Sequence, residues 1–136
     1  MVILLEGTSD LGRTAIAEKV SERHPQWKHL ALGVIENMRP PEGEEDDERP
    51  FHLQVVKRCV EELEKVGLHL ILSLPDAHEH LTLLQKGLRP NCVVIHLGDA
   101  PRDDDTYDYV FDTKSKSMKE ITKFLDDLVT DLSKHA

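Results

Sequence analysis

The sequence predicts an α/β fold, a three-layer domain in which a parallel five-stranded sheet carries helices on both faces. Short apolar runs alternate with segments whose apolar residues recur at helical spacing. The first apolar run is followed at once by a loop bounded by Gly7 and Gly12, and a helical pattern begins directly after it. At 136 residues the chain is expected to form one domain, residues 1–136, with a substantial core.

The first strand is predicted at Val2 to Leu5. Its residues are all apolar, which is typical of a strand that is covered on both faces in a parallel sheet. The first helix is expected from about Arg13 to about Arg23, because Pro25 cannot continue it. Residues 27–32 then alternate and predict a second strand near an edge of the sheet.

Residues 34–38 indicate a short helix, and the segment 39–50, RPPEGEEDDERP, is expected to be an acidic mobile loop. Prolines flank a run of carboxylates there, and the segment has no apolar side chain to bury. A calcium loop is an alternative for residues 44–48, but their spacing does not match an EF-hand. A solvated run of charges is the simpler interpretation.

The second half of the chain repeats the alternation of strands and helices. A helix is predicted over residues 51–66, where Leu53, Val56 and Val60 share one face, and the sequence leaves open whether it packs on its own sheet or on a second copy. Further elements are expected at 69–74 (strand), 77–88 (helix), 92–97 (strand) and 107–111 (strand). Ser117 and Glu120 form an S-x-x-E capping box, which predicts the start of the last helix.

Composition excludes several classes of function. The formal net charge of −9 makes the chain a poor non-specific binder of nucleic acid, because phosphate contacts require clustered Lys and Arg. No apolar run approaches the roughly 20 residues of a membrane helix. Cys59 and Cys92 stand alone in apolar patterns, so we expect buried free thiols in a reducing compartment and a cytoplasmic protein.

The glycine-bounded loop carries the main functional signal. Residues 7–14 read GTSDLGRT, which follows the phosphate-binding pattern G-x-x-x-x-G-K-[ST] except that Arg13 replaces the lysine. The backbone N–H groups of such a loop and the following helix N-terminus bind phosphate. The alternative is a strand-to-helix turn whose glycines only relieve backbone strain.

The chain resembles the nucleoside-monophosphate-kinase-like group of P-loop proteins, which includes shikimate kinase, adenylylsulfate kinase and chloramphenicol phosphotransferase. The resemblance is carried by the order of strands and loops, by the phosphate loop, and by Tyr109 to Thr113 before a helix with an S-x-x-E cap. It implies that ATP or GTP binds with Mg²⁺. The phosphates would contact Gly7, Thr8, Ser9, Asp10, Leu11, Gly12, Arg13 and Thr14.

The same resemblance implies further roles. Thr14 would hold Mg²⁺, and Asp76 would orient the ion or its waters, although Asp76 also suits a helix N-cap. Glu36 would bind the acceptor or act as a base, unless it is a solvated surface charge. Thr113 and Lys114 would lie beside the purine ring, unless they are ordinary linker residues.

Three departures from that group bear on catalysis. Arg13 keeps the charge of the usual lysine but is bulkier. The segment between the fourth and fifth strands, where such kinases carry an arginine-bearing lid, holds Arg102 and three adjacent acids, 103–105, and phosphoryl transfer depends on neutralising negative charge. The acidic segment 39–50 would repel an anionic acceptor and favours a neutral or cationic one, or a basic protein partner.

The sequence supports two main functional hypotheses. In the first, the chain is a kinase that transfers the γ-phosphoryl group of ATP or GTP to a small molecule. In the second, it is a regulatory or interaction module that binds a nucleotide or anion without turnover. A protein partner, or a second copy of the chain in a homodimer, is the macromolecular partner to be considered. A receiver-type domain is a third alternative on fold-level analogy, because Lys114 lies near the required lysine, but Glu6 is the only acid near the end of the first strand.

Overall fold

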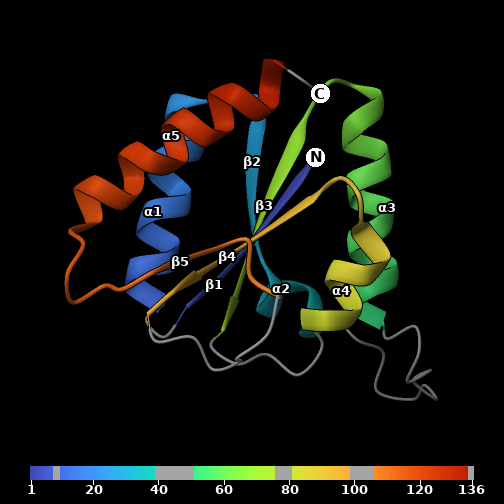
Figure 1. Ribbon diagram of the computed structural model, residues 1–136. Helices are drawn as coiled ribbons and strands as arrows, with labels where there is room; N and C mark the ends of the chain where they lie inside the picture. Colours follow the sequence, from blue (N-terminus) through green and yellow to red (C-terminus); the bar gives the residue numbers. More distant parts are fainter. Residues whose placement is uncertain (8–9, 39–50, 76–80, 99–105, 135–136) are drawn as a thin grey trace.

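The computed structural model describes residues 1–7, 10–38, 51–75, 81–98 and 106–134. Its centre is one sheet of five strands, all parallel, in the order β2-β3-β1-β4-β5 (Figure 1). The strands are β1 (Val2–Gly7), β2 (Trp27–Ala31), β3 (His69–Pro75), β4 (Cys92–Leu97) and β5 (Tyr109–Phe111). The predicted fold class is confirmed, and the second strand lies at an edge as expected.

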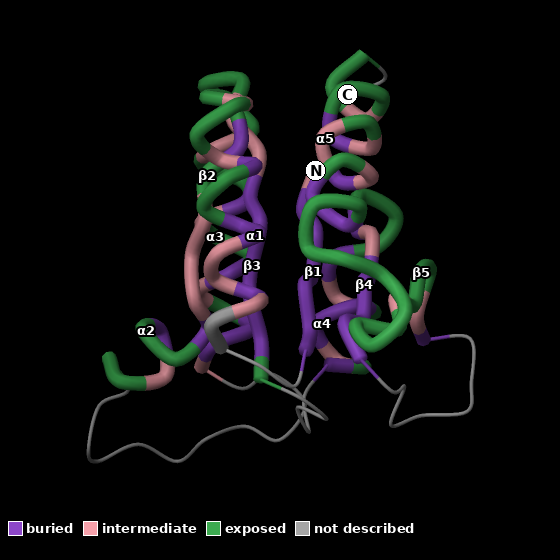
Figure 2. The backbone as a smooth tube through the Cα atoms, turned by 90° about the vertical axis from the view of Figure 1, so that its left-hand side faces the viewer, coloured by how far each residue is buried: buried purple, intermediate pink, exposed green. Residues whose placement is uncertain are grey.

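Helices cover both faces of this sheet. One face carries α1 (Asp10–Arg23) and α5 (Met118–Lys134), and the other carries α2 (Leu32–Glu36), α3 (Phe51–Lys65) and α4 (Leu81–Leu88) (Figure 1). Alternate residues of β1 serve the two sides: Val2 and Leu4 join the core under α3 and α4, and Ile3 and Leu5 join the core under α1 and α5. Figure 2 shows buried residues gathered along the central strands and exposed residues on the outer surfaces of the helices.

The helix boundaries differ from expectation mainly at α1. This helix begins at Asp10, before the predicted start at about Arg13, so Gly12 lies inside it rather than ending a loop. The packing of α1 explains the difference: Ile16, Ala17 and Val20 are buried against the sheet, and tertiary burial outweighs the low helix propensity of one glycine. The long helix α3 packs on its own sheet, which answers the question that the sequence left open.

The predicted capping box at the start of α5 is confirmed. The Glu120 N–H donates to Ser117 Oγ at 3.1 Å, and the Ser117 N–H donates to Glu120 Oε1 at 3.4 Å. Further along α5, Ser133 Oγ accepts the indole N–H of the fully buried Trp27 at 3.0 Å. The last of these bonds ties the C-terminal part of α5 to the edge strand β2. Within the described residues, no helix is long and apolar enough to cross a membrane.

The two cysteines are both free, and they differ in burial. Cys92 is 3% exposed at the start of β4, and burial raises the pKa of its thiol to about 12. Cys59 is only partly buried on α3.

We therefore expect a single thiol of the native protein to react with a disulfide reagent at about pH 8, because the reactive form is the thiolate. Cys59→Ser should abolish the fast reaction, and both thiols should react in denaturant. A native Cys59→Ser protein that reacts at the rate of the wild type would contradict this assignment.

Candidate functional site

The site begins where β1 ends, at Gly7. This residue pairs with Pro75 of β3 on one side and with Leu97 of β4 on the other. A Cβ atom at Gly7 would lie 3.0 Å from Leu97 Cβ, 3.1 Å from Arg13 Cγ and 3.2 Å from the Leu97 carbonyl oxygen. The close approach of neighbouring chain segments therefore favours glycine at this position, because any Cβ would have to displace them.

Helix α1 starts shortly after Gly7, and its N-terminus lies at the carboxyl edge of the sheet (Figure 1). The first four backbone N–H groups of a helix have no partner within the helix, and the helix dipole adds partial positive charge. In α1 these groups belong to residues 10–13, which are the fourth to seventh positions of the predicted phosphate motif. The arrangement suits an anion, although α1 begins earlier than the sequence predicted.

Arg13 turns back toward β1. Its side chain is 7% exposed, and Nη1 donates a hydrogen bond to the carbonyl oxygen of Gly7. The side chain of the seventh residue of the motif is thus bonded to the backbone of the first residue, and its positive charge lies at the buried start of the site. A lysine could donate there only as a compact point charge, without the planar fork of arginine.

A pocket of about 560 Å³ opens beside this helix N-terminus. Its walls come from α1, the end of β4, and the segment that enters α5. The lining residues are Gly12, Arg13, Ala15, Ile16, Leu97, Thr113, Lys116, Ser117, Met118 and Ile121. Most of the lining is apolar, and Arg13 and Lys116 are its two basic residues, so the pocket suits a flat apolar ring attached to an anionic group.

The segment between β5 and α5 is held by Asp112. Its Oδ1 accepts the Lys114 N–H at 2.9 Å, and its carbonyl oxygen accepts the Lys116 N–H at 2.9 Å. An aspartate that binds the backbone two residues ahead makes a compact turn. This turn presents Thr113 and Lys116 to the pocket, whereas Lys114 is exposed and is not among the lining residues.

The structure brings together some of the predicted site residues. Gly12, Arg13 and Thr113 line one pocket. Gly7 is connected to it by the hydrogen bond from Arg13, and Thr14 follows Arg13 in the first turns of α1. Glu36 is partly buried at the end of α2, on the other face of the sheet. For residues 10 and 11 the structure describes the backbone. Thr8, Ser9, Asp76 and Arg102, and the acidic segment 39–50, lie outside the described residues.

Sequence reasoning missed a buried polar cluster that adjoins the site. Glu6 Oε1 accepts the Tyr107 hydroxyl at 2.7 Å and lies 2.8 Å from His96 Nδ1, and Glu6 and His96 are both 0% exposed. The available signal was one charged and one titratable residue inside otherwise apolar strand runs. The sequence also missed the contribution of Lys116, Ser117 and Met118 to the pocket, because it gave no measure of how closely α5 approaches α1.

Two other histidines lie away from this edge. His29 Nε2 is 2.9 Å from Ser73 Oγ, and burial lowers the pKa of His29 while Glu18 opposes the shift. Burial also lowers the pKa of His69, with the terminal ammonium acting in the same direction. Both shifts favour neutral imidazoles in the folded protein. Among the described residues, no group of three or more His, Cys, Asp or Glu side chains could hold a metal ion.

No protein-family model matches the sequence, and no curated protein sequence matches it. Solved structures do resemble the fold. The tunicamycin resistance protein of Deinococcus radiodurans superposes with a TM-score of 0.65 at 13% identity, over 94% of each chain. A gluconokinase from Sinorhizobium meliloti gives 0.57 at 12% identity, over 98% of this chain and 94% of that one.

The hexameric APS kinase of Thiobacillus denitrificans gives a TM-score of 0.63 at 14% identity, over 98% of this chain but only 30% of that protein. The chain therefore shares its fold with these proteins, two of which are kinases by name, and this agrees with the fold that the sequence resemblance implied. At these identities the likeness concerns the fold alone, since unrelated functions share such folds.

Gly7→Ala should destabilise the protein by about 1–3 kcal/mol, because the added methyl group overpacks Leu97 and Arg13. Gly33→Ala is the matched control, since a Cβ at Gly33 would meet nothing within 4 Å. Urea unfolding of both variants measures the difference. Equal stabilities of the two variants would contradict the close approach described at Gly7.

Proposed function

We propose that this protein binds ATP or GTP with Mg²⁺ and transfers the γ-phosphoryl group to a neutral or cationic small molecule. The observation that carries the proposal is the pocket of about 560 Å³ that joins the N-terminus of α1 to the start of α5. A purine would occupy its apolar part, between Ile16 and Met118. The phosphates would extend along the backbone N–H groups of α1 toward Gly7.

The chain's own residues would neutralise and orient the phosphates. Arg13 is buried next to Gly7 and would place its charge against the phosphate chain. Thr14 is partly buried in the first turns of α1, and its hydroxyl is the expected Mg²⁺ ligand. This set fits Mg²⁺, because that ion commonly takes few protein ligands and completes its shell with water and phosphate oxygens. Asp76 is the second expected group.

The acceptor would lie on the face of the sheet covered by α2, α3 and α4. Glu36 ends α2 on that side, and its carboxylate would take the proton of the acceptor hydroxyl. Arg102 would stabilise the transferring group. Transfer of a phosphoryl group depends almost entirely on positioning and on charge stabilisation, and these groups are of the types that supply both.

Titration calorimetry with ATP and with GTP, each with Mg²⁺, tests the binding step. Thr14→Ala should weaken nucleotide binding by about tenfold, the loss of one charge-assisted contact. Thr130→Ala on the exposed side of α5 is the matched control and should bind as the wild type does. Absence of heat with every purine nucleotide would refute the proposal.

A second candidate is a regulatory or interaction module that binds a nucleotide or simple anion without transfer. The observation that favours it is the bond from Arg13 to the Gly7 carbonyl, which uses part of the guanidinium inside the protein. Under this alternative the motif only holds an anion, and the replacement of the usual lysine by Arg13 affects no catalytic step.

Arg13→Lys separates the two candidates. For a kinase, the variant should keep or increase nucleotide hydrolysis and transfer, because lysine is the residue that P-loops use to reach the β- and γ-phosphates. For a binding module, affinity should change by a few-fold without any turnover. Assays of ATP consumption beside calorimetry distinguish these outcomes, and a variant with neither binding nor turnover would show that Arg13 itself is required for the anion.

A further inference from the structure

A buried polar cluster connects the start of the phosphate motif to the chain that precedes β5. Glu6 is the last residue of β1 before Gly7, and it is paired in register with His96 of β4. Glu6 Oε1 accepts the Tyr107 hydroxyl at 2.7 Å and lies 2.8 Å from His96 Nδ1. The rings of His96 and Tyr107 are 4.9 Å apart. We call these three residues the Glu6 network.

Packing alone does not account for a carboxylate at this position. Glu6 points to the face covered by α3 and α4, where the neighbouring side chains of β1 are Val2 and Leu4. Burial of a carboxylate costs several kcal/mol before its partners compensate, and apolar replacement of buried polar groups is often neutral or stabilising. The observation that needs a reason is therefore a fully buried acid directly before the phosphate motif.

The Tyr107 hydroxyl is a fixed donor because its backbone is anchored on both sides. Gln85 of α4 donates to the Thr106 carbonyl oxygen at 2.7 Å. Asp108 exchanges two bonds with Val94 of β4, at 2.9 Å through its N–H and at 2.8 Å through Oδ2. Tyr107 thus holds the Glu6 side chain from a rigid base.

On the other side of Glu6, the chain continues into the site. The carbonyl oxygen of Gly7 accepts the Arg13 guanidinium, and Arg13 lines the proposed nucleotide pocket. The path therefore runs from the Tyr107 hydroxyl to the Glu6 carboxylate, through one residue of backbone to the Gly7 carbonyl, and on to Arg13. It links the α3 and α4 face of the sheet to a pocket on the α1 and α5 face.

We propose that Glu6, held by Tyr107 and His96, is a positioning residue that sets the orientation of the Gly7 carbonyl and of Arg13, and thereby the affinity of the site for a phosphate chain. Glu6 does not touch the ligand. The proposal rests on the proposed function for its ligand, whereas the coupling itself is a property of the ligand-free protein. Loss of the Tyr107 hydroxyl leaves the start of the motif less ordered, and the ligand then bears the cost of ordering it.

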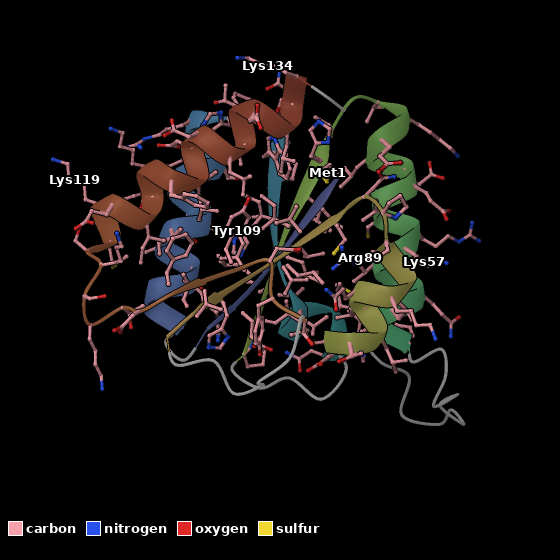
Figure 3. The ribbon with its side chains drawn as sticks, in the orientation of Figure 1. Met1, Lys57, Arg89, Tyr109, Lys119 and Lys134 are labelled. Carbon is pink, nitrogen blue, oxygen red and sulfur yellow. The ribbon has the colours of Figure 1, made fainter. Side chains whose placement is uncertain are left out.

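Tyr107→Phe tests this coupling with the removal of one oxygen atom. We expect affinity for ATP with Mg²⁺, and for inorganic pyrophosphate, to fall by about fivefold, within the usual range of coupling effects. Tyr109→Phe is the matched control: Tyr109 lies on the edge strand β5, where its ring packs on Phe124, and it should bind as the wild type does (Figure 3). Unchanged affinity in Tyr107→Phe would overturn the proposal.

A pair of variants at Glu6 separates positioning from stability. Glu6→Leu fills the space without a polar group, and Glu6→Gln retains an oxygen that can accept the Tyr107 hydroxyl. Glu6→Leu leaves the Tyr107 hydroxyl and His96 Nδ1 without their acceptor, so its thermal midpoint should fall. With a positioning role, Glu6→Leu loses more affinity than this fall explains, and Glu6→Gln keeps most of the affinity. With a purely structural role, both variants lose affinity only in proportion to a lowered midpoint, which would overturn the proposal.

Amide NMR of the ligand-free protein keeps the two proposals distinct. Tyr107→Phe should shift the Gly12 and Arg13 amide resonances and Tyr109→Phe should leave them in place, whether or not a nucleotide binds. If the wild type binds neither nucleotide nor pyrophosphate, the proposed function fails and these shifts alone decide the coupling. Unmoved Gly12 and Arg13 resonances in Tyr107→Phe would refute the coupling even if ATP binds.

Discussion

The burial of β1 is the constraint on which the rest of the structure depends. This strand is paired with β3 on one edge and with β4 on the other, and its side chains enter both cores. At the carboxyl end of β1, Gly7 lies so close to Leu97 that an added Cβ would be 3.0 Å from Leu97 Cβ. The pairing of β1 with both neighbours fixes Gly7, and with it the carboxyl edge of the sheet beside which α1 begins.

The charge at the site is organised by hydrogen bonds of the protein to itself. Arg13 is buried and binds the Gly7 carbonyl, while Glu6 is buried on the other side of the same backbone and binds Tyr107. The Arg13 cation and the Glu6 acid thus lie on either side of the backbone at Gly7, and each is hydrogen-bonded within the protein. Such pre-arranged groups lower the cost of organising the site when an anion arrives.

The two faces of the sheet have different parts in the proposed chemistry. The face of α1 and α5 offers a mainly apolar pocket that suits a purine ring. The face of α2, α3 and α4 carries Glu36 and the Glu6 network, and it would receive the acceptor. The carboxyl edge of the sheet joins the two, as is usual for ligand sites in open parallel sheets.

The sequence by itself determined the fold class and the capping box of α5, because each depends on local pattern: continuous apolar runs that alternate with helical periodicity, and a serine three residues before a glutamate. Tertiary structure alone decided that α1 begins at Asp10, that Arg13 folds onto Gly7, and that Glu6 meets His96 and Tyr107. Glu6 meets partners 90 and 101 residues further along the chain. The pairing of β1 with β4 brings His96 to it, and the bonds of Asp108 to Val94 bring Tyr107, and no local pattern in the sequence encodes either.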